Sequence, residues 1–98
     1  MAVITINGCR VAPADVGALR ELLGAYIEEL RAREAGCLHA RVLVEAEDPC
    51  AVIVYAEFRD EEAYAEHLSS SHVAALRSRL HPLIGDTHHK TIYRAFVG

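Results

Sequence analysis

The sequence predicts an α+β fold of the ferredoxin-like βαββαβ type, with helices on one face of a four-stranded antiparallel sheet. Two observations lead to this prediction. Segments with alternating apolar residues and segments with helical spacing follow one another in the order strand, helix, strand, strand, helices, strand. A short polar turn joins the two central strands, as in an antiparallel hairpin. The chain has 98 residues, the size of one domain, so we expect a single domain over residues 1–98.

The first half of the chain predicts a strand, a long helix and a hairpin. Residues 2–8 alternate in a way typical of a strand, and Pro13 marks the start of a helix. The apolar residues of this helix recur at intervals of three or four, and we expect Gly36 to cap its end. They are Leu19, Leu22, Leu23, Tyr26, Ile27 and Leu30. Residues 37–46 and 51–59 then predict two strands, joined by a turn at residues 47–49.

The second half predicts two helices and a last strand. Acidic residues 60–62 begin a short helix that runs to Leu68, and a run of serines interrupts it. A second helix begins after a serine N-cap and ends at Gly85. Residues 87–97 predict the final strand.

The strand at residues 51–59 is apolar on both faces. Val52, Val54, Ala56 and Phe58 share one face, and Ala51, Ile53 and Tyr55 share the other. Helices on one side of the sheet can cover only the first of these faces. We therefore expect a second copy of the sheet to cover the other, in a two-fold homodimer.

Composition excludes several classes of function. The net charge is -4, and the 10 basic residues are interleaved with 14 acidic ones, so we expect no nucleic-acid partner and no binding to anionic membranes. Apolar stretches are short, and the first ten residues lack an export pattern. The three cysteines have no CxxC spacing. These features predict a cytoplasmic protein with free thiols.

Several short motifs resemble the antibiotic biosynthesis monooxygenase (ABM) family. They are Gly36-Cys37-Leu38, Asp48-Pro49, and the block from Glu57 to His72 with its acidic stretch and two histidines. The resemblance covers nearly the whole chain. It implies a dimeric α+β barrel with a pocket between sheet and helices in each subunit. It further implies oxidation of phenolic or quinol substrates by O₂, with no metal, flavin or other cofactor.

The resemblance also places candidate substrate contacts. In the polyketide oxygenases of the family, the residues that contact the substrate stand at positions similar to Val54, Phe58 and Tyr64 of this chain. An arginine at a position similar to Arg77 or Arg79 is a further contact. The chain departs from the family at two of these positions. Phe58 stands where a tryptophan is usual, and Val54 stands where an asparagine is expected.

The haem-degrading branch of the family fits less well. Asn7 matches the asparagine on its first strand. His67 and Arg77, however, stand where that branch has its tryptophan and its haem-ligating histidine. We therefore do not expect haem oxygenation.

Tyr64 and His67 are the strongest candidates for catalysis. Their spacing of three places both side chains on one helix face, where a neutral imidazole could take a phenolic proton. We predict His67 as the proton acceptor, with Tyr64 and Asn7 orienting the substrate oxygens. The alternatives are that His67 caps carbonyls at its helix end and that Asn7 is held by Thr5 or the backbone.

Further residues are predicted to line the pocket. Its apolar wall is expected to contain Val54, Phe58, Leu76 and Leu80, with Arg77 nearby. His72 is either a pocket-edge or a structural residue. The six histidines include no i,i+4 pair and no HExxH pattern, so spacing predicts no metal site.

Together these features predict a cofactor-independent monooxygenase that acts on a phenolic or quinol-type small molecule and O₂. Two other classes stay open, because fold does not fix function. One is an isomerase of a small oxygenated metabolite, in which the same groups act without O₂. The other is a non-catalytic dimer that binds a small ligand.

Overall fold

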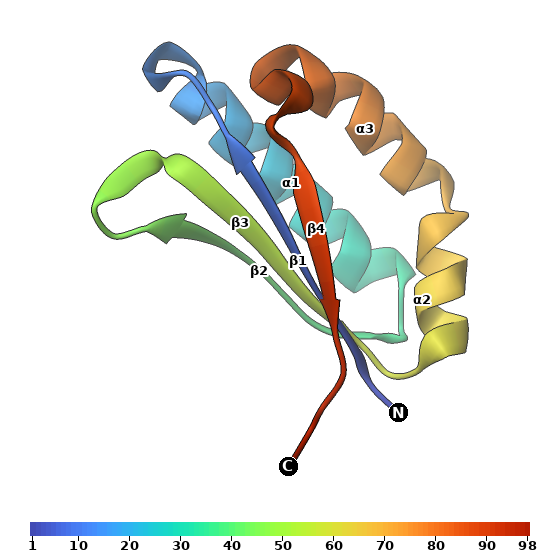
Figure 1. Ribbon diagram of the computed structural model, residues 1–98. Coiled ribbons are helices and arrows are strands. Elements are labelled where there is room, and N and C mark those ends of the chain that lie inside the picture. Colours follow the sequence, from blue (N-terminus) through green and yellow to red (C-terminus); the bar gives the residue numbers. More distant parts are fainter.

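The computed structural model describes residues 1–98 and confirms the ferredoxin-like α+β fold (Figure 1). One antiparallel sheet has the strand order β2-β3-β1-β4, and the helices lie on one of its faces. The strands are β1 (Val3–Arg10), β2 (Cys37–Glu45), β3 (Asp48–Phe58) and β4 (His89–Tyr93). The helices are α1 (Val16–Arg33), α2 (Glu61–Leu68) and α3 (Ser71–Ile84), with 3-10 turns at Pro13–Asp15 and Gly85–Thr87. No helix has both the length and the apolar character needed to cross a membrane.

The register between β1 and β3 decides which side chains face the helices. Three pairs lie on that side of the sheet: Val3 with Phe58, Thr5 with Ala56, and Asn7 with Val54. Val3 and Phe58 are fully buried in a core that α1 and α2 complete. The polar Asn7 therefore points to the helix side, where a substrate pocket would lie.

The hairpin between β2 and β3 differs from the expectation. We expected the turn at residues 47–49, but residues 46–47 form it, and Asp48 already pairs with the end of β2. The Asp48 carboxylate accepts the Cys50 N–H at 3.0 Å and the Arg10 guanidinium at 2.9 Å. These contacts hold the start of β3 against β1, although an Asp-Pro pair is typical of turns.

The last strand is shorter than expected. We predicted residues 87–97, but β4 contains only five residues. Tyr93 pairs with Ile4, next to the start of β1, so little of that strand remains for later residues to pair with. Arg94 instead donates from Nε to a Glu61 oxygen of α2 at 2.8 Å.

Gly36 has a different role from the predicted helix cap. Glu34 occupies the C-cap of α1, and Gly36 has no positive φ. A Cβ at Gly36 would lie 2.5 Å from the Ala63 Cβ, so glycine allows α2 to approach closely. Gly85 follows α3 with a φ of 57°, which confirms the predicted cap there.

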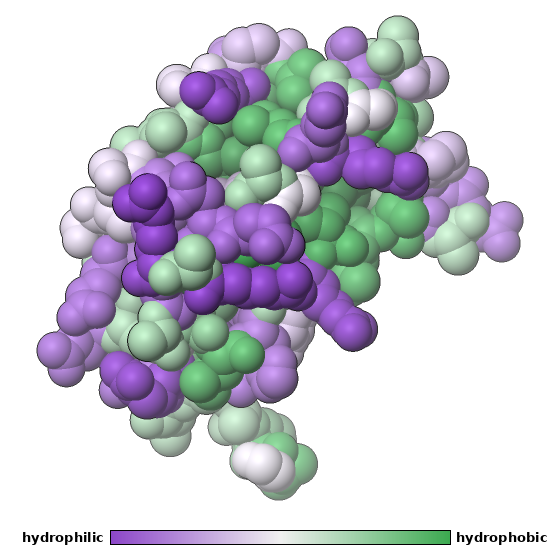
Figure 2. All heavy atoms as spheres, turned by 180° about the vertical axis from the view of Figure 1, so that it is seen from behind, coloured by the Kyte–Doolittle hydropathy of each residue, from purple (hydrophilic) through white to green (hydrophobic).

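The face of the sheet away from the helices carries apolar side chains that nothing covers within the chain. They are Ile4, Ile6, Leu43, Ile53, Tyr55 and Tyr93, of which Leu43, Ile53 and Tyr93 are exposed. Val42 and Val44 of β2 pair with Val54 and Val52 on the helix side of the sheet, and they are exposed as well. The view from behind shows apolar surface between charged groups (Figure 2). Several large apolar side chains of the sheet are therefore exposed in the single chain. A second copy of the sheet would cover those on the open face, and the homodimer stays a prediction.

Asp60 caps α2, and its loss should destabilise the fold. Its carboxylate accepts the Ala63 N–H at 2.8 Å. We expect Asp60→Ala to lower the free energy of unfolding by about 1 kcal/mol, because the first turn of α2 loses its acceptor. Urea denaturation at fixed protein concentration measures this. Asp60→Asn retains a cap of similar strength, so an equal loss in both variants would contradict the explanation.

Candidate active site

A cavity of about 260 Å³ lies between the sheet and the three helices, where the family resemblance implied a pocket. Most of the predicted site residues lie on its wall. They are Asn7, Val54, Tyr64, His67, Leu76, Arg77 and Leu80. Of the two arginines that the sequence left as alternatives, Arg77 is on the wall and Arg79 is not.

Two predicted contacts lie behind the wall. Phe58 is fully buried, with its ring centroid 4.7 Å from that of His67 and 5.4 Å from that of Tyr64. His72 is not among the residues that line the cavity, and it hydrogen-bonds to Glu34. The structure therefore places Phe58 and His72 as supports of the residues that line the cavity.

His67 is held by side chains on both of its ring nitrogens. Its Nδ1 lies 2.9 Å from both carboxylate oxygens of Glu34, and a carboxylate can only accept, so Nδ1 carries the proton. Its Nε2 then has a lone pair, which the Tyr26 hydroxyl approaches at 3.3 Å. The ring nitrogens therefore do not cap carbonyls at the helix end, which was the alternative.

Burial makes His67 suitable as a proton acceptor. Loss of water around the ring lowers the pKa of His67 below 6.5, and the hydrogen bond that His67 donates to Glu34 opposes this shift only in part. Burial and the negative charge of Glu34 raise the pKa of Tyr26. At neutral pH His67 is therefore neutral and can accept a proton, while the Tyr26 hydroxyl keeps its own.

Tyr64 and His67 share one face of α2, as their spacing predicts. Their rings are stacked, with centroids 6.3 Å apart and an angle of 18° between planes. Lys90 of β4 donates from Nζ to the Tyr64 hydroxyl at 2.9 Å. This contact brings a cation to the cavity wall beside the phenol.

Asn7 has a partner that the sequence did not suggest. His88 donates from Nε2 to the Asn7 Oδ1 at 2.8 Å, so neither Thr5 nor the backbone holds the amide oxygen. Burial and the nearby Lys90 charge lower the pKa of His88. The amide N–H₂ of Asn7 remains as a donor for a ligand oxygen.

The wall of the cavity has basic side chains and no acidic ones. Arg77 and Lys90 lie on it, with His67 and His88, and none of its residues is Asp or Glu. The whole chain, in contrast, has a net charge of -4. The cavity therefore favours a ligand that is an anion or becomes one.

Four residues that hydrogen-bond to predicted site residues were not themselves predicted: Tyr26, Glu34, His88 and Lys90. Tyr26 was recognised only as part of the apolar face of its helix. Glu34 had no signal in the sequence, because its two histidine partners lie 33 and 38 residues away.

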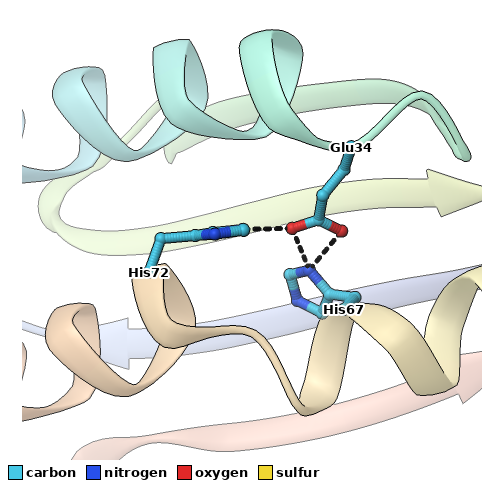
Figure 3. A group of neighbouring side chains, drawn as sticks. All are labelled: Glu34, His67 and His72. Carbon is cyan, nitrogen blue, oxygen red and sulfur yellow. Dashed lines mark hydrogen bonds and ion pairs between the residues drawn. The ribbon is translucent and has the colours of Figure 1, made fainter.

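Glu34 contacts both histidines of the predicted site (Figure 3). One ligand-type atom from each of Glu34, His67 and His72 lies within 4.8 Å of the others. We expected no metal site because no spacing in the sequence indicated one. Spacing cannot detect this group, however, since its members follow α1, end α2 and begin α3.

The Glu34–His67 contact has a measurable electrostatic effect. Glu34 raises the pKa of His67, so we expect Glu34→Gln to lower that pKa further. An NMR titration of the His67 ring should show the midpoint move to lower pH. Glu29→Gln removes an exposed carboxylate from α1, the helix that Glu34 caps, and should leave the midpoint of the His67 titration unchanged. A midpoint that rises in Glu34→Gln would contradict this electrostatic description.

The lowered pKa of His67 also determines how this residue makes the stability of the fold depend on pH. The folded pKa of His67 is lower than its unfolded value of about 6.5, so the unfolded chain binds this proton more tightly. The contribution of His67 to stability is therefore fully present above that value. It is lost as the pH falls through the folded pKa.

Comparison with known proteins identifies the family. The model of the antibiotic biosynthesis monooxygenase family matches residues 2–79, and no curated protein matches the chain. Rv0793 from Mycobacterium tuberculosis is similar in structure, with a TM-score of 0.89, 24% identity, and coverage of 100% of this chain and 98% of that one. A conserved protein from Methanosarcina mazei Go1 has a TM-score of 0.88 at 26% identity, covering 96% and 92% of the two chains.

A further solved structure carries the family's name. It is that of an antibiotic biosynthesis monooxygenase, with a TM-score of 0.86 and 19% identity, covering 97% of this chain and 99% of that one. At this identity the likeness shows the fold alone. The family model, in contrast, spans both catalytic candidates of α2 and most of the cavity wall. On this match, the chain belongs to the antibiotic biosynthesis monooxygenase family.

Proposed function

We propose that this protein is a cofactor-independent monooxygenase that oxidises a phenolic or quinol-type small molecule with O₂. The observation that carries the proposal is the imidazole of His67 on the cavity wall, whose Nδ1–H donates to Glu34 at 2.9 Å. Membership of the ABM family supports the same reaction class.

The cavity suits one small aromatic substrate. Its volume of about 260 Å³ is just below the usual range for ligand sites. Val54, Leu76 and Leu80 offer an apolar wall for a ring. Arg77 and Lys90 would stabilise the phenolate that forms when the substrate loses its proton.

Proton removal would begin the reaction. A substrate hydroxyl replaces the long 3.3 Å contact between Tyr26 and His67, and its proton passes to Nε2 of His67. Glu34 stabilises the imidazolium that results. Asn7 and Tyr64 orient the substrate oxygens.

The anion then reacts with O₂. The electron-rich ring supplies all the electrons, one oxygen atom enters the product, and the other leaves as water. The protein's part is to hold the anion, exclude bulk water and admit O₂ to an apolar site. No step requires an electron donor other than the substrate.

We further propose that two copies pair through the open face of the sheet. Leu43, Ile53 and Tyr93 are exposed there, and another sheet would cover them. Sedimentation at micromolar concentration should give the mass of a dimer. A monomer mass under those conditions would remove this part of the proposal.

An isomerase is the second candidate. The basic cavity wall favours it as well, because Arg77 and Lys90 could hold the anionic group of a small oxygenated metabolite. His67 would then move a proton within the substrate, and O₂ would not be used.

Oxygen uptake separates the candidates. The purified chain, treated with chelator, is incubated with hydroquinones and anthrone-like phenols in an oxygen electrode cell. We expect uptake above the uncatalysed rate, with a quinone-type product. Substrate conversion without uptake would favour the isomerase. Ligand-induced thermal stabilisation without any conversion would favour a binding protein.

A further inference from the structure

Glu34, His67 and His72 form a compact cluster beside the cavity (Figure 3). Glu34 follows the end of α1, His67 lies in the last turn of α2, and His72 lies in the first turn of α3. The carboxylate sits between the two imidazole rings. All three side chains are only 11 to 12% exposed, so the cluster is largely shielded from water.

The donor atoms have a spacing that a metal ion can bridge. The His67 Nδ1 lies 2.9 Å from each Glu34 oxygen, and the His72 Nε2 contacts one of those oxygens. All three donor atoms are within 4.8 Å of one another. Ligand atoms around a tetrahedral ion with bonds of about 2.1 Å lie roughly 3.4 Å apart. Small ring rotations would therefore open enough space at the centre of the cluster.

The charge of Glu34 gives an independent argument. Buried carboxylates are usually paired with a cation or bound to a metal. Glu34 has no lysine or arginine partner, and its only ionic contacts are with the two imidazoles. When both rings are neutral, the cluster carries one unbalanced negative charge. A bound dication would neutralise this charge and leave the cluster with a net charge of +1.

Tyr26 adds a feature typical of metal-binding histidines. Such a histidine usually donates its other ring N–H to a nearby oxygen, which fixes the ring orientation. When a metal binds Nδ1 of His67, the ring proton moves to Nε2. The Tyr26 oxygen, 3.3 Å away, is placed to accept it.

We propose that Glu34, His67 and His72 bind one divalent transition-metal ion of the zinc class. Two imidazoles and one carboxylate form a three-ligand set, with water completing the coordination. This inference goes beyond the proposed oxygenase function and does not depend on it. Because the ion and a proton compete for the same ring nitrogens, metal affinity decreases as the pH falls.

The metal site also has a consequence for the oxygenase. With the ion on Nδ1, the Nε2 of His67 carries a proton and has no lone pair for a substrate hydroxyl. Loading with Zn²⁺ should therefore inhibit metal-free oxygen uptake, and chelator should restore it.

Direct titration tests the site without any substrate. Zn²⁺ is added to the chelator-treated chain in a calorimeter, and Co²⁺ is added while the visible absorption is recorded. We expect one ion per chain and the intense visible bands of four-coordinate Co²⁺. His72→Gln and Glu34→Gln should each weaken Zn²⁺ binding by about 10-fold or more.

His81→Gln is the matched control. His81 also pairs with a carboxylate, Asp86, at 3.4 Å, but this pair is exposed. We expect its removal to leave Zn²⁺ affinity unchanged. Equal affinity in all variants, or equal loss in the control, would overturn the proposal.

A measurement on the unaltered chain avoids dependence on the folding of the variants. Zn²⁺ should shift the NMR signals of the His67 and His72 rings and leave those of His39 in place. Shifts confined to other histidines would contradict the site. Since oxygen uptake is assayed on metal-free protein, failure of metal binding and failure of the oxygenase proposal are distinguishable.

Discussion

Replacement of His67 by Gln is expected to lower the rate of oxygen consumption by about 100- to 10,000-fold, the usual contribution of a general base. Gln cannot accept the phenolic proton, although its size is similar to that of His. The Glu34 carboxylate would then lose the group that it orients at 2.9 Å. The measurement is kcat in an oxygen electrode with a substrate that the wild-type chain turns over.

The control is His39→Gln, which removes an exposed imidazole on β2. It should keep the wild-type rate. Circular dichroism and thermal unfolding establish that both variants are folded. A wild-type rate in folded His67→Gln would eliminate His67 as the proton acceptor.

The pH dependence of kcat/KM provides a second test of His67. Burial lowers the pKa of His67, so the acid limb of kcat/KM in the free enzyme should have its midpoint below 6.5. Glu34→Gln should move this limb to still lower pH, because the raising effect of Glu34 is lost.

Replacement of Phe58 by Ala is expected to lower the free energy of unfolding by about 3 to 5 kcal/mol. Phe58 is 0% exposed and ends β3, opposite the equally buried Val3. Its ring packs against Tyr64 and His67, at centroid distances of 5.4 Å and 4.7 Å. The truncation leaves a cavity behind the two catalytic candidates, and urea denaturation at fixed concentration measures its cost.

Phe96→Ala provides the comparison. Phe96 is 98% exposed, so its truncation should change stability by no more than about 0.5 kcal/mol. A small effect at Phe58 would mean that the wall behind Tyr64 can collapse without loss of packing. A large effect at Phe96 would indicate that the C-terminal segment is covered in solution by a partner.

Much of the fold follows from patterns between near neighbours in the chain. Alternation along β1 placed Thr5 and Asn7 on one face, and helical spacing put Tyr64 and His67 together on α2. Gly85 was recognised as a cap because a turn with positive φ depends on one residue. These features depend on backbone geometry that repeats every two or three to four residues.

The ends of strands and helices were less predictable, because the neighbouring elements that pack or pair with them decide where they end. The last strand stops at Tyr93, where β1 nears its first residue, and nothing in residues 94–97 themselves signals this end. Gly36 resembles a helix cap in sequence, but it is required by the approach of Ala63 from α2.

The features of the candidate site also separate into those that the sequence predicted and those that only the tertiary structure showed. The sequence predicted the fold class, and the spacing of Tyr64 and His67 predicted that both side chains lie on one helix face. Only the tertiary structure decided that Glu34 holds both His67 and His72, that Lys90 reaches Tyr64, and that Phe58 lies behind the wall. The contacts of Glu34 and Lys90 join side chains 26 to 38 residues apart. Such distances in sequence leave no periodic signal. The Glu34 contacts depend on how the end of α1 packs against the junction of α2 and α3, and the Lys90 contact depends on how β4 lies beside α2.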